Sequence, residues 1–201
     1  MRLQQHLNES GFMTTANWEA LKADLDKKCK PYIKELKGAK SLLIRGVAQP
    51  KVPQFMTIRS VRKDRNPRLI DTKLHMKLGK LSKELFGWNI RSEGLFTTKS
   101  EIDVRMWGKP VIIFPIGNFK YVWKDDVTEL YKQYDSWNPF GDNENIFELD
   151  IEPEIRGYHT DNLNKYLRMP AKITSECIIN CNTYYSINMK WYQTLLTYYG
   201  K

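Results

Sequence analysis

Four residues in this chain, in three separate segments, carry side chains that could do chemistry together. Arg45 follows an apolar run in the stretch SLLIRGV, Thr97 and Thr98 end the segment RSEGLFTT, and Glu176 begins the alternating run ECIINC. An arginine at a strand end can hold an anion, hydroxyls both donate and accept hydrogen bonds, and a carboxylate can stabilise a developing cation. We expect Arg45 and the Thr97–Thr98 pair to close two strands and Glu176 to open a third, and strand ends are positions where ligands commonly bind.

Other common kinds of site find little support in the sequence. The signatures GxxxxGK[ST], GxGxxG and GxSxG are missing. The histidines are too scattered for a histidine triad or metal centre: His6, His75 and His159. The odd number of cysteines, none in a CxxC pair, argues against a disulfide framework and favours reduced structural thiols: Cys29, Cys177 and Cys181. We therefore expect no metal.

Length, composition and charge set the broad class. The 201 residues are 41% hydrophobic and fit one domain, 1–201, with a helical N-terminal part of about 1–38. No run approaches 18 apolar residues, and the first residues lack the apolar core of a secretory signal, so we expect a soluble cytoplasmic protein. The net charge of +9 implies an anionic partner: nucleic acid, a nucleotide or an acidic protein surface.

The hydrophobic pattern predicts short strands alternating with a few helices. We expect a helix over 17–36, capped by Asn17 and bent or split at Pro31, and a leucine helix capped by Asp71 that ends at Gly87. We expect strands over 41–47, 91–98 and 110–117, a strand and helix from Tyr121 onward, and a strand from Glu176. Residues 48–70 are predicted to be an irregular connection and 135–160 a mobile loop.

In order and strand context, Arg45, the Thr97–Thr98 pair and Glu176 resemble the Arg, Ser-Thr-Ser, Glu pattern of mono-ADP-ribosyltransferases. The resemblance covers most of the chain, from KKCKPYIKEL to YYSI. It is closest to phage-encoded members, in which a basic R-x-P-R segment precedes a leucine helix and an F-T strand. Here those segments read DRNPRLIDTKLHMKL and FGWNIRSEGLFTTKS.

The resemblance implies an α+β fold of the ADP-ribosyltransferase-like split type, with two packed, mainly antiparallel sheets and flanking helices around an NAD cleft. It implies transfer of ADP-ribose from NAD to a macromolecular acceptor, a host protein or nucleic acid if the chain is phage-encoded, with release of nicotinamide. Arg45 would bind the NAD pyrophosphate with Gly46 beside it. Thr98, with Thr97, would order the site, and Glu176 would be catalytic.

Two departures from the family pattern concern the acceptor and the second motif. Thr-Thr-Lys stands in place of Ser-Thr-Ser, and Phe96 aligns Thr98 with the first serine, which leaves the matches of Lys99 and Ser100 open. Thr174 occupies the position two residues before Glu176, where relatives carry Glu or Gln. Because that position commonly helps to select the acceptor, the target is left open.

Further candidates for NAD contacts each have a structural alternative. Arg91 could bind a phosphate or pair with Glu93 or Glu101, and His75 could touch the ligand or lie at the edge of the core. Tyr121, with Trp123, could stack on nicotinamide or fill the core. The basic cluster Arg59–Arg68 could hold the adenosine side of NAD or an acidic target, or remain solvated.

Two other functions stay open on the sequence. The same pocket with water as acceptor would make an NAD glycohydrolase. Alternatively, the surplus of positive charge and the mixture of aromatic and basic residues in FKYVWK suit a non-catalytic protein that binds nucleic acid.

Overall fold

The computed structural model describes residues 15–63, 72–127, 151–172 and 174–201. Within these ranges the chain forms two antiparallel sheets and several helices, so the predicted α+β class is confirmed. The first sheet has the order β1-β4-β7-β2 and consists of β1 (Ile44–Val47), β4 (Lys109–Pro115), β7 (Thr183–Asn188) and β2 (Met56–Ser60). The second has the order β3-β6-β5 and consists of β3 (Leu95–Thr97), β6 (Glu176–Asn180) and β5 (Lys120–Lys124).

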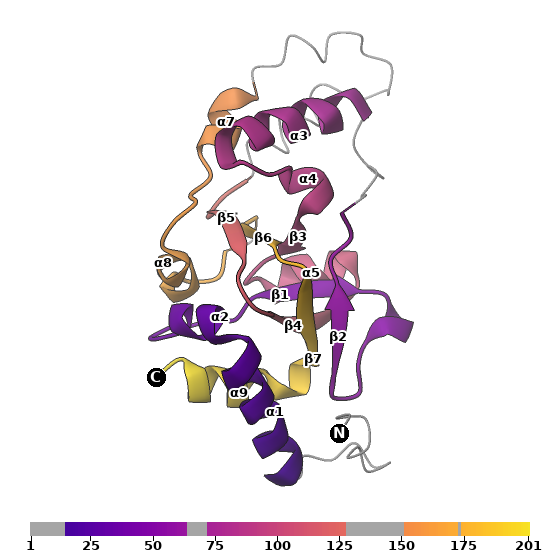
Figure 1. The fold of residues 1–201 in the computed structure, drawn as a ribbon, viewed down its shortest axis with the longest axis vertical. Coiled ribbons are helices and arrows are strands. Elements are labelled where there is room, and N and C mark those ends of the chain that lie inside the picture. The colour runs from indigo at the N-terminus through magenta and orange to yellow at the C-terminus, as the bar shows by residue number, and fades with distance from the viewer. Residues whose placement is uncertain (1–14, 64–71, 128–150, 173) are drawn as a thin grey trace.

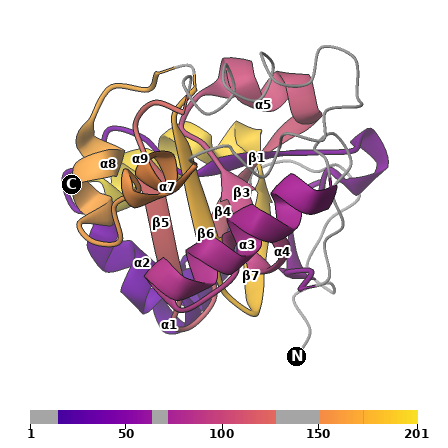
Figure 2. The same ribbon diagram turned by 90° about the horizontal axis from the view of Figure 1, so that it is seen from above.

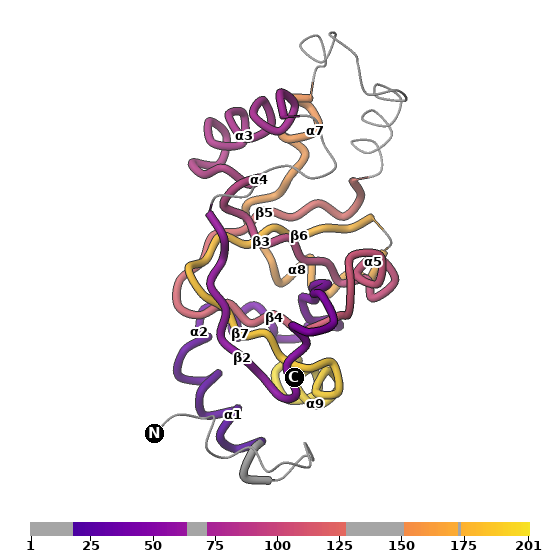
Figure 3. Tube along the Cα trace, turned by 90° about the vertical axis from the view of Figure 1, so that its right-hand side faces the viewer, coloured from indigo at the N-terminus to yellow at the C-terminus, as the bar shows by residue number. Residues whose placement is uncertain are grey.

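Helices cover both outer sides of this pair of sheets (Figure 1, Figure 3). Against the three-stranded sheet lie α3 (Thr72–Phe86), α4 (Ile90–Glu93) and α7 (Glu152–Arg156). Beneath the four-stranded sheet lie α1 (Thr15–Lys28), α2 (Lys30–Glu35) and α9 (Tyr192–Tyr199), while α8 (Leu163–Arg168) lies at the side, close to α2 (Figure 1, Figure 2). The remaining elements are α5 (Glu101–Trp107) and the 3-10 turns η2 (Gln49–Lys51) and η4 (Met189–Trp191).

Two hydrophobic clusters hold these layers together. The larger includes residues of both sheets and of α1, α2, α8 and α9, such as Leu25, Tyr32, Phe114 and Leu195. The smaller lies between the three-stranded sheet and α3, α4 and α7, and its members include Leu78 and Ile178. Alternation along β6 explains the division: Cys177 and Ile179 belong to the larger cluster, and Ile178 to the smaller.

The leucine helix and the chain split at Pro31 agree with the sequence predictions. α3 carries Leu74 and Leu78 buried, and the chain leaves its end at Gly87 with φ 73°, a conformation that glycine adopts without strain. α1 and α2 are separated at Cys29, and Pro31 lies in the first turn of α2, where its missing N–H costs no hydrogen bond. Asp71, the predicted cap of α3, lies outside the described residues.

Three predicted boundaries are wrong. α1 begins at Thr15, so Asn17 is inside the helix and not its cap. The strand predicted over 41–47 begins only at Ile44, because hydroxyls of Tyr192 and Tyr32 accept the N–H groups of Leu42 and Leu43 in place of a neighbouring strand (3.0 and 3.2 Å). Arg45 is therefore the second residue of β1 and does not close it.

Two predicted segments contain structure that the sequence did not indicate. The connection predicted over 48–70 includes β2, which pairs with β7 along its whole length. The strand predicted over 91–98 is shortened to β3 by the helical turn α4, which Asn89 caps through its side chain. The strand predicted over 110–117 is confirmed as β4 (Lys109–Pro115), and so is the start of β6 at Glu176.

The loop predicted over 135–160 falls mostly outside the described residues. Its last part, 151–160, contains α7, and Ile151, Ile155 and Tyr158 are buried there against the three-stranded sheet. That part is wrongly predicted as a mobile loop, because three apolar side chains at helical spacing are enough to anchor a short helix. The helix predicted after the Tyr121 strand also begins outside the described residues.

Candidate functional site at the junction of the two sheets

The three predicted motifs meet where the two sheets touch. Ile44 of β1 and Thr98 exchange two backbone hydrogen bonds of 2.9 and 3.0 Å, which join the sheets at one point. Thr97 is paired with Cys177 in the β3–β6 ladder. Arg45 is next to Ile44 and Glu176 is next to Cys177, so the backbones of all three motifs lie around one junction, although they are far apart in sequence.

Arg45 points its guanidinium group at the backbone of β3. Its Nη1 donates a hydrogen bond to the carbonyl oxygen of Phe96 at 2.7 Å, and the residue is half-buried. Burial lowers the pKa of Arg45, and the nearby Tyr184 opposes this shift. An arginine remains charged at neutral pH in spite of such a shift, so the junction contains a fixed cation with only part of its fork engaged.

Glu176 is a buried carboxylate, with 6% of its surface exposed, at the first position of β6. It lies on the same face of the strand as Ile178, toward the helices α3 and α7, and the hydroxyl of Tyr158 donates a hydrogen bond to its Oε1. Burial raises the pKa of Glu176, while the Tyr158 hydrogen bond and the positive charges of Arg91 and Lys124 act in the opposite direction. Arg45 is not among these charges.

Two cations other than Arg45 provide the positive potential near Glu176. Lys124 is directly opposite Glu176 in the β5–β6 ladder, and its ammonium group pairs with Glu154. Arg91 lies over the ring of Phe96, with its guanidinium carbon 5.1 Å from the ring centroid. The buried Nε of Arg91 has no hydrogen-bond partner among the described residues. The site is thus electropositive around one buried acid.

The sequence left open whether Arg91 forms a structural ion pair. In the described ranges, Glu93 accepts a hydrogen bond from Asn180 at 3.3 Å, and Glu101 pairs with Arg105 at 2.7 Å. Neither of these carboxylates neutralises Arg91, and within the described part of the chain its charge acts on Glu176.

The two threonines brace the junction through the backbone. Thr97 donates from its hydroxyl to the carbonyl oxygen of Cys177 at 2.6 Å, and the hydroxyl of Thr98 accepts from the N–H of Ser100 at 3.0 Å. Both side chains are buried. The Thr97 hydroxyl thus links β3 to β6, whereas the Thr98 hydroxyl closes a local turn before α5.

Close packing of the backbone requires a glycine at position 46. A Cβ atom at this position would lie 2.8 Å from the carbonyl oxygen of Val104 and 2.9 Å from the backbone of Trp107. Helix α5 therefore approaches β1 too closely for any side chain. This contact explains the glycine without a ligand.

The aromatic candidates lie on the other face of the three-stranded sheet. Tyr121 accepts a hydrogen bond from the N–H of Leu163 at 3.2 Å, and Trp123 stacks on His159 with centroids 4.1 Å apart. Side chains alternate along a strand, so Tyr121 and Trp123 lie on the opposite face of β5 from Lys124, which is on the Glu176 side. Packing near α8 explains both rings, so the structural alternative is favoured. His75 is half-buried on α3, the helix that covers the Glu176 face.

The turn before Glu176 is held in an uncommon conformation. Thr174 has φ 73°, which costs a residue with a β-branched side chain free energy. Its N–H donates to Oδ2 of Asp103 on α5 at 3.0 Å, its hydroxyl donates to Asp126 at 2.9 Å, and its carbonyl oxygen accepts from Val127 at 3.0 Å. The position predicted to help select the acceptor is thus tied to α5 and to the end of β5.

Sequence analysis missed Tyr158, Lys124 and Lys99. Tyr158 falls in the segment predicted as a loop, and its contact with Glu176 depends on how α7 packs. Lys99 is 4% exposed, and its ammonium group donates to the carbonyl oxygens of Tyr166, Met169 and Pro170 at 2.8, 3.4 and 3.3 Å. The run TTKS at a strand end drew attention to Lys99, but nothing in that run predicts that the lysine side chain is buried.

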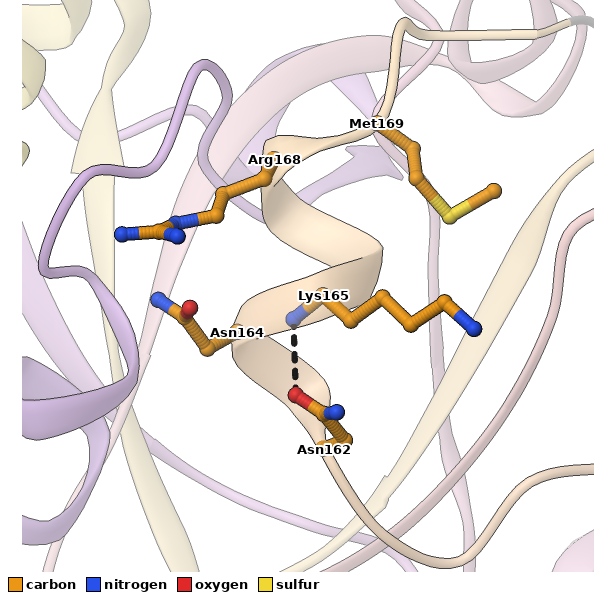
Figure 4. A pocket seen from close by; sticks show the side chains of 5 residues that line it. All are labelled: Asn162, Asn164, Lys165, Arg168 and Met169. Carbon is orange, nitrogen blue, oxygen red and sulfur yellow. Dashed lines mark hydrogen bonds between the residues drawn. The ribbon is translucent and has the colours of Figure 1, made fainter.

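Surface hollows in the described part of the chain include two that lie elsewhere. One, of about 320 Å³, is lined by Asn162, Asn164, Lys165, Arg168 and Met169 on and beside α8 (Figure 4). The other, of about 260 Å³, is lined by residues 118–120 and 180–182. Arg45, Thr98 and Glu176 line neither of them, so the candidate site is defined by its chemistry and not by a preformed hollow.

No group of three histidine, cysteine or acidic side chains that could hold a metal ion occurs among the described residues. Within the same ranges, no helix is both long and apolar enough to cross a bilayer.

No protein-family model matches the sequence, and the comparisons with curated proteins and with solved structures find no match. The resemblance to mono-ADP-ribosyltransferases therefore stays a prediction. The structure does place the Arg45, Thr98 and Glu176 segments at one junction of two antiparallel sheets.

Proposed function

We propose that this protein has an ADP-ribosyltransferase-like split fold and transfers ADP-ribose from NAD to a macromolecular acceptor, with release of nicotinamide. The observation that carries the proposal is Glu176, a buried acid hydrogen-bonded by Tyr158, beside the junction that also holds Arg45 and Thr98. A carboxylate kept out of water at a desolvation cost is a common mark of a functional site. Its position at the start of a strand suits the role predicted from the sequence.

Arg45 is proposed to bind the NAD pyrophosphate. Its guanidinium group presents five N–H donors in a planar fork, of which one hydrogen bond goes to the carbonyl oxygen of Phe96. That bond fixes the orientation of the group, and a phosphate can take the remaining donors in bidentate fashion. Arg91, above the Phe96 ring, adds a second positive charge for the same anion.

Glu176 is proposed to stabilise the sugar cation that forms during the reaction. The bond between the ribose C1′ and the nicotinamide nitrogen breaks, and its electron pair leaves with nicotinamide. The ribose acquires oxocarbenium character, which the ionised carboxylate stabilises as in glycoside hydrolysis. A nucleophilic atom of the acceptor then bonds to C1′ and loses its proton. Tyr158 orients the carboxylate through Oε1.

The acceptor is proposed to be a host protein or nucleic acid, in keeping with the resemblance to phage-encoded enzymes and with the net charge of +9. Water as acceptor would make the same site an NAD glycohydrolase. The Thr174 turn, tied to Asp103 and Asp126, is proposed to face the acceptor because it directly precedes Glu176.

Labelled NAD tests the proposal directly. We expect the purified protein to release nicotinamide from NAD labelled in its ADP-ribose part and, in a bacterial lysate, to attach the label to macromolecules. Loss of the attached label on protease treatment identifies a protein acceptor, and loss on nuclease treatment a nucleic acid. Label found only as free ADP-ribose would replace the transferase with a glycohydrolase, and no nicotinamide release in any lysate would contradict both.

Replacing Arg45 by lysine tests its assignment to NAD. We expect Arg45→Lys to fold normally, since a lysine ammonium can still donate to the carbonyl oxygen of Phe96, and to bind NAD about 10-fold or more weakly because the bidentate fork is lost. Calorimetric titration with NAD measures the affinity, and thermal melting checks the fold. The matched control is Arg105→Lys on the exposed face of α5. An unchanged NAD affinity in Arg45→Lys would remove this residue from the site.

A further inference from the structure

A second feature of the molecule is a positively charged surface around α8. It shares no residue with the Glu176 site. We propose that this surface binds single-stranded nucleic acid. The basic surface consists of six exposed cations on α2, on the segment after it, on α8 and at the end of the chain: Lys34, Lys37, Lys40, Lys165, Arg168 and Lys201.

Backbone contacts bring these cations together from distant parts of the sequence. Asn164 of α8 donates from its side chain to the carbonyl oxygens of Glu35 and Lys37, both at 2.7 Å, and Nη2 of Arg168 donates to the same Lys37 oxygen at 3.3 Å. Figures 1 and 2 show α2, α8 and the end of the chain on one side of the molecule. The surface is therefore built by tertiary contacts and is not a run of charge along one segment.

The end of the chain and the segment after α2 complete the surface. The N–H of Lys40 donates to the carbonyl oxygen of Leu167, and the N–H of Gly38 donates to that of Gly200, both at 3.0 Å. The second contact places Lys201 beside Gly38.

The positive charge of this surface is not neutralised within the described residues. None of the six cations forms an ion pair with a carboxylate of residues 15–63, 72–127, 151–172 or 174–201. Carboxylates close to α8 include Glu35, which accepts a hydrogen bond from the N–H of Asn164 at 3.0 Å, and Asp161, which is next to Asn162 in the chain. Exposed lysines and arginines without acidic partners are the means by which proteins bind a phosphate backbone.

A hollow of about 320 Å³ in this surface offers groups suited to an unpaired base (Figure 4). Its size is at the lower end of the range for small-molecule sites. The amide nitrogen of Asn162 and the side-chain oxygen of Asn164 form no hydrogen bond with other described residues, and each can pair with a base edge. Met169 supplies an apolar contact, and Lys165 and Arg168 supply charge. A duplex hides its base edges in the grooves, so the combination favours a single strand.

A lipid bilayer fits this surface less well. Interfacial membrane binding combines cations with large apolar side chains that enter the headgroup region. The large hydrophobic side chains that are exposed among the described residues lie on β2, α3, α5 and α9 and not on α2 or α8: Ile58, Met76, Ile102, Met106, Trp107 and Tyr198. The basic surface on α2 and α8 thus lacks the large exposed apolar side chains that membrane insertion requires.

A fluorescein-labelled 20-nucleotide single-stranded DNA, followed by anisotropy between 50 and 300 mM salt, tests the proposal. We expect the wild type to bind it, and the variant Lys37→Glu, Lys40→Glu, Lys165→Glu to bind at least about 10-fold more weakly at 100 mM salt. Each lost phosphate contact lowers the slope of log K against log salt by about 0.7, so the slope should fall by about 2. These three side chains are exposed, so the fold should be kept, and circular dichroism checks this.

The matched control carries the same change in net charge at three exposed lysines elsewhere: Lys51→Glu, Lys80→Glu and Lys109→Glu. We expect it to bind within about threefold of the wild type. A separate Arg168→Gln variant, which lacks one cation of the hollow, should weaken binding without a charge reversal. The assay contains no NAD, so its outcome is independent of the proposed transferase activity.

Three outcomes would overturn the proposal. The first is equal loss of binding in the basic-surface variant and in the control, which would show that net charge alone attracts the oligonucleotide. The second is tighter binding of a 20-base-pair duplex than of the single strand. The third is absence of oligonucleotide binding together with sedimentation on phosphatidylserine vesicles that depends on the basic surface, which would assign it to membranes.

Discussion

Replacing Glu176 by glutamine is expected to reduce nicotinamide release by about 100-fold or more while NAD still binds. A carboxylate that stabilises a sugar cation acts mainly in the transition state, so its loss lowers turnover and leaves ground-state affinity largely unchanged. Glutamine has nearly the same shape and can accept the hydrogen bond from Tyr158, so the fold should be kept. Steady-state nicotinamide release and NAD titration on the same variant measure the two effects.

The same substitution is expected to stabilise the protein at neutral pH. Burial raises the pKa of Glu176 above the ordinary 4.5, so the folded protein binds this proton more tightly than the unfolded chain does. The carboxyl group therefore contributes its full stability below about pH 4.5 and loses it as the pH rises through the raised pKa. Glutamine never ionises, so Glu176→Gln should melt at a higher temperature than the wild type at pH 7.

Melting curves from pH 4 to pH 8 check the sign of this effect. The gain of Glu176→Gln over the wild type should shrink toward pH 4, and wild-type nicotinamide release should rise with pH as the carboxyl ionises. Glu101→Gln is the control, because that carboxylate is half exposed on α5 and pairs with Arg105. Near-normal turnover in Glu176→Gln would remove Glu176 from the site and, with it, most of the case for a transferase.

Replacing Lys99 by methionine is expected to lower the free energy of unfolding by about 3–5 kcal/mol, more than any other substitution proposed for this protein. The Lys99 ammonium donates to the carbonyl oxygens of Tyr166, Met169 and Pro170 and lies 3.8 Å from Oδ1 of Asp125. Methionine fills the same space but donates nothing, so buried carbonyls at the end of α8 lose their partner. Since these contacts tie α8 to the residue after Thr98, the loss should also loosen the junction.

Urea unfolding at pH 7 measures this effect, and Lys172→Met is its control. Lys172 pairs with the same Asp125 at 2.5 Å, but its side chain is 58% exposed, so its removal should cost no more than about 1 kcal/mol. Equal stability of Lys99→Met and the wild type would show that the desolvation of the buried ammonium cancels its hydrogen bonds, as occurs in some buried ion pairs.

The sequence alone determined the class of the fold and the elements with strong local periodicity. The leucine stripe of α3, the apolar run of β4 and the alternation of β6 each reflect burial on one or both faces, which a short stretch of sequence records. The break between α1 and α2 followed from Pro31, because proline lacks the N–H that a helix interior requires. Glu176 was placed correctly as the first residue of its strand.

The edges of elements were less predictable, because distant side chains decide them. Leu42 and Leu43 lie outside β1 because the hydroxyls of Tyr192, at the other end of the chain, and of Tyr32, in α2, accept their N–H groups. β2 was not predicted because prolines and basic residues surround it in the sequence. It forms because each of its residues pairs with β7. α7 forms in a polar segment because a few of its apolar side chains pack against the Glu176 face of the three-stranded sheet.

Only the tertiary structure decided what surrounds the candidate site. Type and order of residues pointed to Arg45, Thr98 and Glu176, but the pairings that bring their backbones together are long-range contacts: Ile44 with Thr98, and Thr97 with Cys177. The partners of Glu176, which are Tyr158, Lys124 and Arg91, come from elements whose packing no local pattern records. Burial and hydrogen bonding set the pKa of an acid, and both depend on neighbours that the chain acquires only when it folds.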